Sequence, residues 1–326
     1  MDRREFLMAG GMAALVAGRT PPLAQCTARM QEKILASARR QGFGGAVLAE
    51  KNGKVVFERG FRQANIPFDI RNGRDTRYRI ASITKLFTSV LVMRLVEQGR
   101  LSLTDTIGVH LPGNVGEARD QVTLCQLLTA TSGLKDFGRN NGEAYSKPWS
   151  EKELLERFCG GPLAFPPGSK WNYNNADYYL LGKVLEAVQK KPYDGILQEQ
   201  ILRPLKLADT GMADSATITP RLATPYTRDR QTDALSNEAF FYIENYAAAG
   251  AMYSSPYDLL AFSRAPFAGR LLRGRGAQAA VNRQTLQLRD GHLAVQSPSG
   301  RQDHTDGRAP GSYRRHGHPP GPATRP

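Results

Sequence analysis

Apolar positions recur at two different periods along the chain, and the change of period separates predicted strands from predicted helices. Short apolar runs at residues 46–49 and 54–57 flank Asn52-Gly53, which is a strong signal for a two-residue hairpin turn. Apolar residues then follow helical spacing from 83 to 96, and Gly99 is a typical residue for ending such a helix. The pattern predicts a strand hairpin followed by a buried helix that is apolar on nearly every side.

The middle of the chain is mainly helical in its pattern. Helices are predicted at residues 30–40, 124–128, 150–158, 176–188, 195–201 and 254–265, the last with Pro256 just inside its start. We therefore predict an α/β fold of two lobes with the active site in the cleft between them. One lobe is an antiparallel sheet flanked by helices (26–100 and 215–326), and the other is an all-helical insert (101–214).

The first 25 residues have the features of an export signal. Arg3 and Arg4 precede a short apolar stretch that is too short to span a bilayer, and Leu23-Ala24-Gln25 follows. Paired arginines are typical of the twin-arginine kind of signal. Cys26 resembles the anchor residue of a lipoprotein, but Gln25 is bulkier than the small residue such signals require. We expect an exported protein, periplasmic or extracellular, whose mature chain has no transmembrane segment.

The net charge of +14 does not indicate nucleic-acid binding. Residues 270–326 carry ten arginines and three aspartates, so half of the net charge lies in this tail. The rest of the chain shows no basic cluster interleaved with aromatic residues. We expect a small-molecule or peptide substrate, no nucleic-acid partner and a monomer.

Three cysteines, Cys26, Cys125 and Cys159, make an odd count without paired metal spacing. This pattern supports neither a disulfide framework nor a zinc site, and we expect no metal and no cofactor. Cys125 and Cys159 lie in apolar helical contexts, so we expect both in the core.

The chemistry is concentrated at Ser82-Ile83-Thr84-Lys85, at the start of the buried helix. A serine hydroxyl becomes a good nucleophile only when another group takes its proton, and Lys85 stands on the same helix face as Ser82. A second copy of the spacing joins Ser132 and Lys135, and about one copy is expected by chance at average residue usage. Ser132 follows an apolar helix and precedes Gly133, so we expect it to end a helix.

The distribution of histidine disfavours a Ser-His-Asp triad in the main body of the protein. His110 is the only histidine before residue 290, and its polar context suggests that it faces solvent. The proton acceptor is then a lysine or a tyrosine. Tyr173-Asn174-Asn175, beginning 91 residues after Ser82, can complete the proton relay. The structural alternative is a polar turn before a helix, with Asn175 as the helix cap.

Several blocks of sequence resemble the class C β-lactamase and DD-peptidase superfamily, which also includes esterases and D-amino-acid peptidases. They cover roughly residues 42–265 in the family's order and include residues 79–85, 95–103, 127–134, 173–175 and 179–182. The resemblance implies that Ser82 is the acylated nucleophile and Lys85 the base or proton shuttle. It implies that Tyr173 activates Ser82 or protonates the leaving group. It implies that Asn175 orients either the substrate amide or the lysine, and that the Ser82 N–H is part of an oxyanion hole.

The family's third motif, Lys/His-x-Gly, is matched only approximately by Arg315-His316-Gly317. The resemblance implies that Arg315 and Gly317 bind substrate. The chain ends eleven residues after Arg315, where the family continues through two strands and a helix. From residue 268 on there is no Phe or Trp and only one Tyr, a composition that cannot bury much apolar area. We therefore expect incomplete C-terminal strands; a truncated or frameshifted end with a coincidental motif is the alternative.

Two functions follow from these features. The first is an exported serine hydrolase that acts through an acyl-enzyme on a β-lactam, a D-Ala-D-Ala peptide or a small ester. The second is a non-catalytic or defective penicillin-binding-like protein that lacks the strand holding the substrate.

Overall fold

The computed structural model describes residues 23–113, 116–135, 143–229, 231–265 and 269–273. Most of the predicted export signal, residues 1–22, lies outside the described residues. So do Arg315 and Gly317 of the approximate third motif.

The N-terminal part folds into a helix and a strand hairpin. Helix α1 (Leu23–Arg40) packs on the hairpin of β1 (Gly45–Lys51) and β2 (Lys54–Phe61). Asn52 and Gly53 have φ angles of 51° and 77°, and both central residues of a type I′ turn require positive φ. The predicted hairpin is therefore confirmed, together with the residues that turn it.

The remaining strands are short and pair antiparallel. A three-stranded sheet has the order β5-β9-β6, with β5 (Tyr78–Arg79), β9 (Met252–Ser254) and β6 (Gly211–Met212). Two further pairs are β3 (Gln63–Asn65) with β4 (Ile70–Arg71), and β7 (Tyr226–Arg228) with β8 (Leu235–Asn237). Strand β6 lies inside the range 101–214 that the sequence pattern assigned to a helical lobe; the lobe boundaries remain predictions.

Helices fill the middle of the described chain. The α-helices are α2 (Thr84–Glu97), α3 (Ile107–His110), α4 (Ala118–Gln121), α5 (Leu124–Leu128), α6 (Glu143–Ser146), α7 (Glu151–Leu154), α8 (Ala176–Gln189), α9 (Tyr193–Leu197), α10 (Arg203–Leu205) and α11 (Pro256–Arg264). The 3₁₀ segments are η1 (Ala81–Ile83) and η4 (Ile243–Ala249), and the π-helical turns are η2 (Leu155–Cys159) and η3 (Gln198–Leu202).

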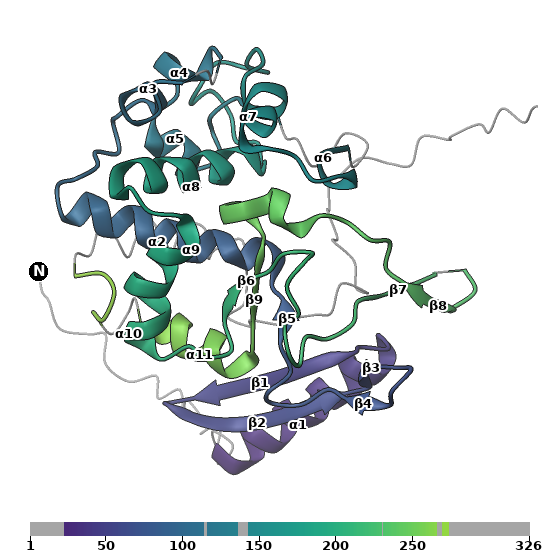
Figure 1. The fold of residues 1–326 in the computed structure, drawn as a ribbon. Helices are drawn as coiled ribbons and strands as arrows, with labels where there is room; N and C mark the ends of the chain where they lie inside the picture. Colours follow the sequence, from purple (N-terminus) through teal and green to yellow (C-terminus); the bar gives the residue numbers. More distant parts are fainter. Residues whose placement is uncertain (1–22, 114–115, 136–142, 230, 266–268, 274–326) are drawn as a thin grey trace, which may run out of the picture.

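Helix α2 is the central element of the fold. It lies between the group of helices α3, α4, α5, α7 and α8 and the layer that contains the β1–β2 hairpin and α1 (Figure 1). It packs against α8 and η4, and Phe87 on α2 stacks on Phe262 of α11 with ring centroids 3.6 Å apart. Buried residues of both layers belong to one hydrophobic core, to which α2 contributes Phe87, Leu91 and Leu95.

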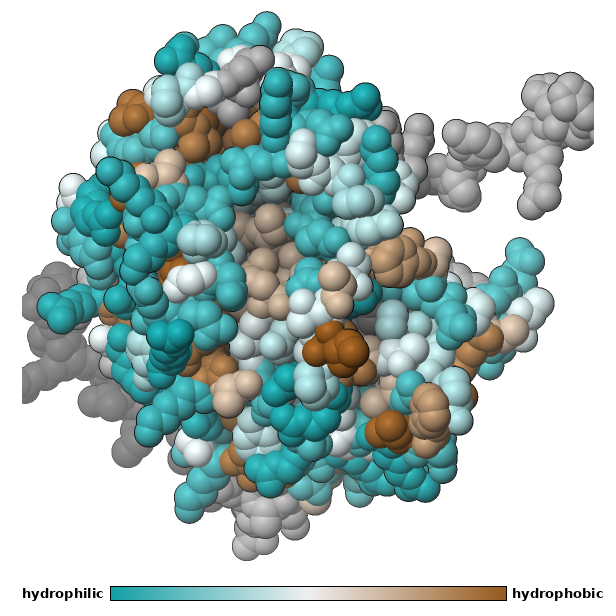
Figure 2. Space-filling view, in the orientation of Figure 1, coloured by the Kyte–Doolittle hydropathy of each residue, from teal (hydrophilic) through white to brown (hydrophobic). Residues whose placement is uncertain are grey.

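Hydrophilic side chains cover most of the face shown in Figure 2, and hydrophobic ones form separate patches. Phe68, Ile218 and Phe240 are among the large apolar side chains exposed in the described part. Within the described residues, the structure has no helix that combines the length and the apolar character needed to cross a bilayer.

Candidate active site

Ser82 lies on a sharp turn between strand β5 and helix α2. The N–H of Ile80 donates to the carbonyl of Met252 at 2.9 Å, which extends the pairing of β5 with β9 up to the turn. Ala81 has a φ of 43°, a conformation that L-residues rarely adopt. Ser82 is exposed and sits in η1, one short turn before α2 begins at Thr84. An unusual backbone conformation beside an exposed serine is a feature that clusters at functional sites.

Lys85 is the buried partner of Ser82. Its side chain is only 5% exposed, and Nζ donates to the Oγ of Ser82 (3.3 Å), the Oδ1 of Asn175 (2.8 Å) and the carbonyl of Ala249 (2.7 Å). An ammonium group has three hydrogens, so each can reach one of these acceptors. Nζ of Lys85 therefore lies within hydrogen-bond distance of Ser82 and is held by three contacts.

Tyr173 is the second residue whose side chain contacts Ser82. Its hydroxyl donates to the Oγ of Ser82 at 2.6 Å, and its ring centroid lies 5.0 Å from Nζ of Lys85. The ring centroid of Tyr178 also lies near Lys85, 5.6 Å from Nζ, but the Tyr178 hydroxyl is hydrogen-bonded to the hydroxyl of Ser89 at 3.1 Å. Burial raises the pKa of Tyr178 above its usual value. Among the described tyrosines, Tyr173 is thus the one bonded to the nucleophile.

Asn175 immediately precedes α8, but its side chain does not cap that helix. Its Oδ1 instead accepts the hydrogen bond from Lys85, 90 residues away in sequence. Of the two roles left open by the resemblance, this contact matches the orientation of the lysine. The structure therefore places Ser82, Lys85, Tyr173 and Asn175 in one cluster.

The second Ser-x-x-Lys copy does not form such a cluster. Ser132 is fully buried, its Oγ donates to Oδ1 of Asp177 at 2.5 Å, and it accepts from the N–H of Leu134 at 3.0 Å. Lys135 is exposed. Helix α5 ends at Leu128, so Ser132 does not open a helix, as expected, but it lies four residues beyond the end of the helix instead of at it.

Two expectations about single residues are wrong. His110 does not face solvent freely: its side chain is 12% exposed and its Nε2 lies 2.8 Å from the Oδ2 of Asp105. Cys125 is exposed instead of in the core, because it projects from the outer side of the short helix α5, whereas Cys159 is buried as expected. No group of three or more potential metal ligands occurs among the described residues.

The carbonyl of Ala249 is a contact that the sequence analysis missed. It lies at the end of η4, where Ala247 has a φ of 39° and a ψ of −125° that interrupt the helix. A backbone carbonyl leaves no signal in residue type, so this partner of Lys85 becomes visible only when η4 packs against α2.

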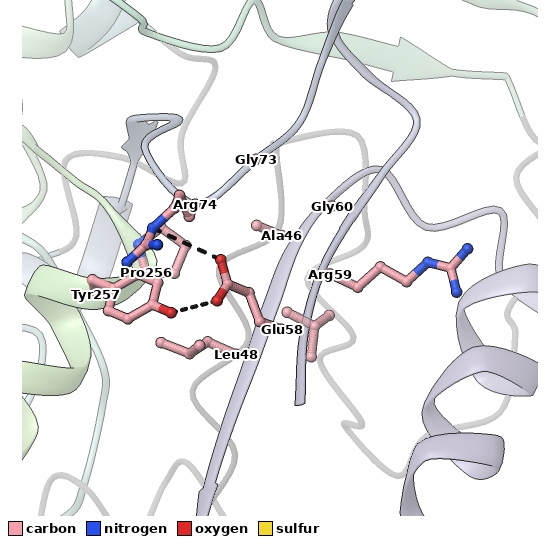
Figure 3. Close-up of a pocket in the computed structure, with 10 residues that line it drawn as sticks. Ala46, Leu48, Glu58, Arg59, Gly60, Gly73, Arg74, Pro256 and Tyr257 are labelled. Carbon is pink, nitrogen blue, oxygen red and sulfur yellow. Dashed lines mark hydrogen bonds and ion pairs between the residues drawn. The ribbon is translucent and has the colours of Figure 1, made fainter. Parts of the chain in front are cut away.

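A separate pocket of about 250 Å³ lies between the β1–β2 hairpin and the start of α11 (Figure 3). Glu58 accepts a hydrogen bond from the hydroxyl of Tyr257, and the guanidinium of Arg74 lies 4.6 Å from the Tyr257 ring centroid. None of Ser82, Lys85 or Tyr173 lines this pocket. Glu58 and Arg74 form an ion pair at 3.9 Å, and the pocket is separate from the cluster around Ser82.

Comparison with known proteins gives a consistent family. The family model described as Beta-lactamase matches residues 23–319, a range that includes Arg315 and Gly317. Protein flp of Staphylococcus aureus is 28% identical over 200 residues, which are 60% of this chain and 40% of that protein. The chain thus aligns with less than half the length of this curated relative.

Two solved structures are similar over most of the chain. A D-stereospecific amidohydrolase from Streptomyces sp. is 30% identical, with a TM-score of 0.64, and the match covers 78% of this chain and 76% of that one. D-amino acid amidase from Ochrobactrum anthropi SV3 is 25% identical, with a TM-score of 0.68, covering 78% and 74%. With the match of the family model to most of its length, the chain belongs to the Beta-lactamase family of serine hydrolases.

Proposed function

We propose that the protein hydrolyses an amide or ester through an acyl-enzyme formed on Ser82. The observation that carries this proposal is the approach of two proton-transfer groups to one oxygen: Nζ of Lys85 at 3.3 Å and the hydroxyl of Tyr173 at 2.6 Å from Oγ of Ser82. Both groups can exchange a proton with the serine, and general acid–base assistance of this kind is worth about 10²- to 10⁴-fold in rate.

In the proposed reaction, Oγ of Ser82 attacks the substrate carbonyl carbon, and its proton passes to Lys85 in its neutral amine form or to Tyr173 in its phenolate form. The scissile C–N or C–O bond then breaks, and the leaving group takes up the proton. Water attacks the acyl ester, releases the acid and regenerates the serine hydroxyl. The N–H of Ser82, at the N-terminal end of α2, is one donor for the oxyanion, and the helix dipole favours the developing negative charge there.

We propose the amide of a D-amino acid, or a short peptide ending in D-residues, as the first substrate class to test. The support is the similarity to two structures that are described as D-stereospecific amidohydrolase and D-amino acid amidase. A β-lactam and a small ester are the other candidates, because all three are attacked at an acyl carbon by the same serine.

Covalent labelling tests the nucleophile directly. A fluorophosphonate probe should add to Ser82 in the wild-type protein, as located by mass spectrometry of the digested chain. Ser82→Ala should abolish the adduct. Ser132→Ala should retain an adduct on Ser82, because Ser132 is buried and is not the residue beside Lys85. A label on Ser132, or equal loss in both folded variants, would contradict the assignment.

Turnover assays identify the substrate class and address the alternative function. D-phenylalanine amide, a D-Ala-D-Ala peptide, nitrocefin and a p-nitrophenyl ester are measured in parallel with wild type and Ser82→Ala. Turnover that Ser82→Ala removes supports the hydrolase. Labelling of Ser82 without turnover of any of the four supports instead the defective penicillin-binding-like protein.

We also propose that the protein is exported and acts as a monomer. Arg3 and Arg4 support export by the twin-arginine route, and replacing both with Lys should retain the protein in the cytoplasm of an expressing bacterium. Light scattering after size exclusion measures the oligomeric state, and a mass near 35.9 kDa or slightly less is expected.

A further inference from the structure

The serine of the second Ser-x-x-Lys copy has a chemical environment that differs from that of an ordinary loop residue. Ser132 and Asp177 are both fully buried, and the Ser132 hydroxyl donates to Oδ1 of the carboxylate at 2.5 Å. Removing a carboxylate from water is strongly unfavourable unless hydrogen bonds replace the lost solvation. The hydrogen bond from Ser132 therefore replaces part of the solvation that the carboxylate of Asp177 loses on burial.

The other oxygen of Asp177 is bonded to Asn174. Nδ2 of Asn174 donates to Oδ2 of Asp177 at 2.9 Å, and the N–H of Asp177 donates to Oδ1 of Asn174 at 2.8 Å. Asn174 is only 2% exposed. The two side chains thus form a closed pair of hydrogen bonds at the start of α8, which fixes the backbone between them.

Asn174 stands between the two residues that reach the nucleophile. Tyr173 bonds to Ser82, and Asn175 bonds to Lys85. A second tie holds the same loop, since the N–H of Asn172 donates to the carbonyl of Ala130 at 2.8 Å. A fixed side chain at position 174 therefore constrains the side chains on either side of it.

We propose that Ser132 and Asp177 are positioning residues for the reaction at Ser82. The buried chain Ser132–Asp177–Asn174 holds the loop so that the hydroxyl of Tyr173 lies within hydrogen-bond distance of Oγ. This inference rests on the proposed acylation of Ser82, and it gives the second Ser-x-x-Lys copy a function that is not nucleophilic.

The chain contains a matched pair that has the same chemistry away from the site. Thr210 is 4% exposed, and its hydroxyl donates to Oδ2 of Asp258 at 2.8 Å. This pair links the segment before β6 to α11. A substitution here should reduce stability as a lost buried hydrogen bond does, without moving Tyr173.

The experiment compares Ser132→Ala and Asp177→Asn with Thr210→Ala. Two readouts are used: the second-order rate of labelling by a fluorophosphonate probe, and kcat and KM for p-nitrophenyl acetate. A displacement of about 1 Å in a reacting group can cost about 100-fold, so we expect kcat to fall about 10- to 100-fold in the two site variants. KM should change by less than about twofold, because the lost contact acts on the transition state. Thr210→Ala should lower the melting temperature and leave kcat unchanged.

A reciprocal exchange gives a rescue test. In the double variant Asn174→Asp with Asp177→Asn, the amide at 177 can still accept from Ser132 and can donate to the carboxylate at 174. The double variant should recover part of the rate that Asp177→Asn loses. Ser132→Ala keeps the charge and removes one hydroxyl, so it provides the test if Asp177→Asn does not fold.

The outcomes separate this inference from the proposed function. A wild-type protein that neither labels nor hydrolyses the ester would overturn the proposed function and this inference with it. A reactive wild type with unchanged kcat in folded Ser132→Ala and Asp177→Asn would overturn the positioning role alone. So would a loss of rate that tracks melting temperature equally in the site variants and in Thr210→Ala.

Discussion

Gly182 on α8 packs so closely against Ala248 of η4 that a Cβ at position 182 would lie 2.5 Å from the Cβ of Ala248. The segment that it contacts supplies two carbonyls to α2. The carbonyl of Ala248 accepts from the hydroxyl of Thr88 at 2.7 Å, and that of Ala249 accepts from Nζ of Lys85 at 2.7 Å. Gly182 on α8 is therefore linked, through η4, to the position of Lys85.

Gly182→Ala should destabilise the protein and slow the reaction together. The added methyl group must displace either α8 or η4, and overpacking of this kind costs about 1–3 kcal/mol. The displaced carbonyl of Ala249 would also release one of the three contacts of Lys85. Urea denaturation measures the first effect, and the labelling rate of Ser82 measures the second.

Gly195→Ala on α9 is the control for this change. A Cβ at position 195 would meet no atom within 4 Å, and Ala is favoured over Gly inside a helix by about 0.5–1 kcal/mol. Stability should therefore be unchanged or slightly higher, with an unaltered labelling rate. Equal stability and rate in both variants would contradict the link through η4.

Substitution of the two proton-transfer groups should separate their roles. Lys85→Arg retains a positive charge but cannot give up its proton, so we expect acylation to slow by about 10²- to 10⁴-fold, the range for a general base. Tyr173→Phe removes the hydroxyl that donates to Ser82 and keeps the ring.

The rate at which the probe labels Ser82 is measured for both variants and for wild type over a range of pH. Circular dichroism checks that each variant is folded. If Lys85→Arg turns over at close to the wild-type rate, then Tyr173 or water removes the proton without it. If Tyr173→Phe is nearly normal, the lysine acts alone.

Asp105 should stabilise the protein at neutral pH more than in acid. A hydrogen bond from the N–H of Ser102 lowers the pKa of Asp105, and the bond with His110 lowers it further, while burial opposes them. A lowered pKa in the folded state means that the unfolded chain binds the proton more readily. The contribution of Asp105 is therefore present above its unfolded pKa of about 3.9 and is lost as pH falls through the lower folded value.

Melting temperatures of Asp105→Asn and wild type test this sign. The wild type should melt higher at about pH 6, and the gap should narrow below about pH 4, near the unfolded pKa of aspartate. Asp120→Asn is the control, since the Asp120 side chain is 73% exposed. A difference in melting temperature between wild type and Asp105→Asn that grows on acidification would contradict the predicted sign.

The approximate third motif makes a prediction of its own. If Arg315 binds a substrate carboxylate, the charge-assisted hydrogen bond is worth about 1.5–3 kcal/mol. Arg315→Ala should then lower kcat/KM about 10- to 100-fold for a peptide with a free carboxylate. Arg314→Ala, the adjacent residue of the same type, should have little effect. Equal effects of the two substitutions would mean that the motif is coincidental.

The frameshift alternative is tested at the level of the gene. A shifted frame predicts that another frame of the DNA encodes a more apolar sequence across residues 270–326. The protein would then melt with little cooperativity and turn over weakly, because its α/β lobe would lack strands. Stop codons throughout the other frames, or a cooperative melt with ordinary rates, would exclude a shifted frame.

Local chemistry let the sequence predict much of the fold. Asn52-Gly53 specifies the β1–β2 turn because both residues tolerate positive φ, and helix spacing places Lys85 beside Ser82 because residues three apart share a helix face. Helix α8 begins at Ala176, as its apolar pattern predicts. In each case the interacting groups lie within a few residues of one another, so residue type alone is informative.

Tertiary packing decided which distant groups meet at Ser82. The chain has 12 tyrosines, and only the packing of α8 on α2 brings the hydroxyl of Tyr173 to the nucleophile and the amide of Asn175 to Lys85. The packing of α5 beside α8 buries Ser132 against Asp177, and the packing of η4 against α2 brings the carbonyl of Ala249 to the lysine. These contacts join residues 45 to 164 positions apart, and no local propensity encodes them, because their energies depend on burial and partners that exist only once the layers have closed.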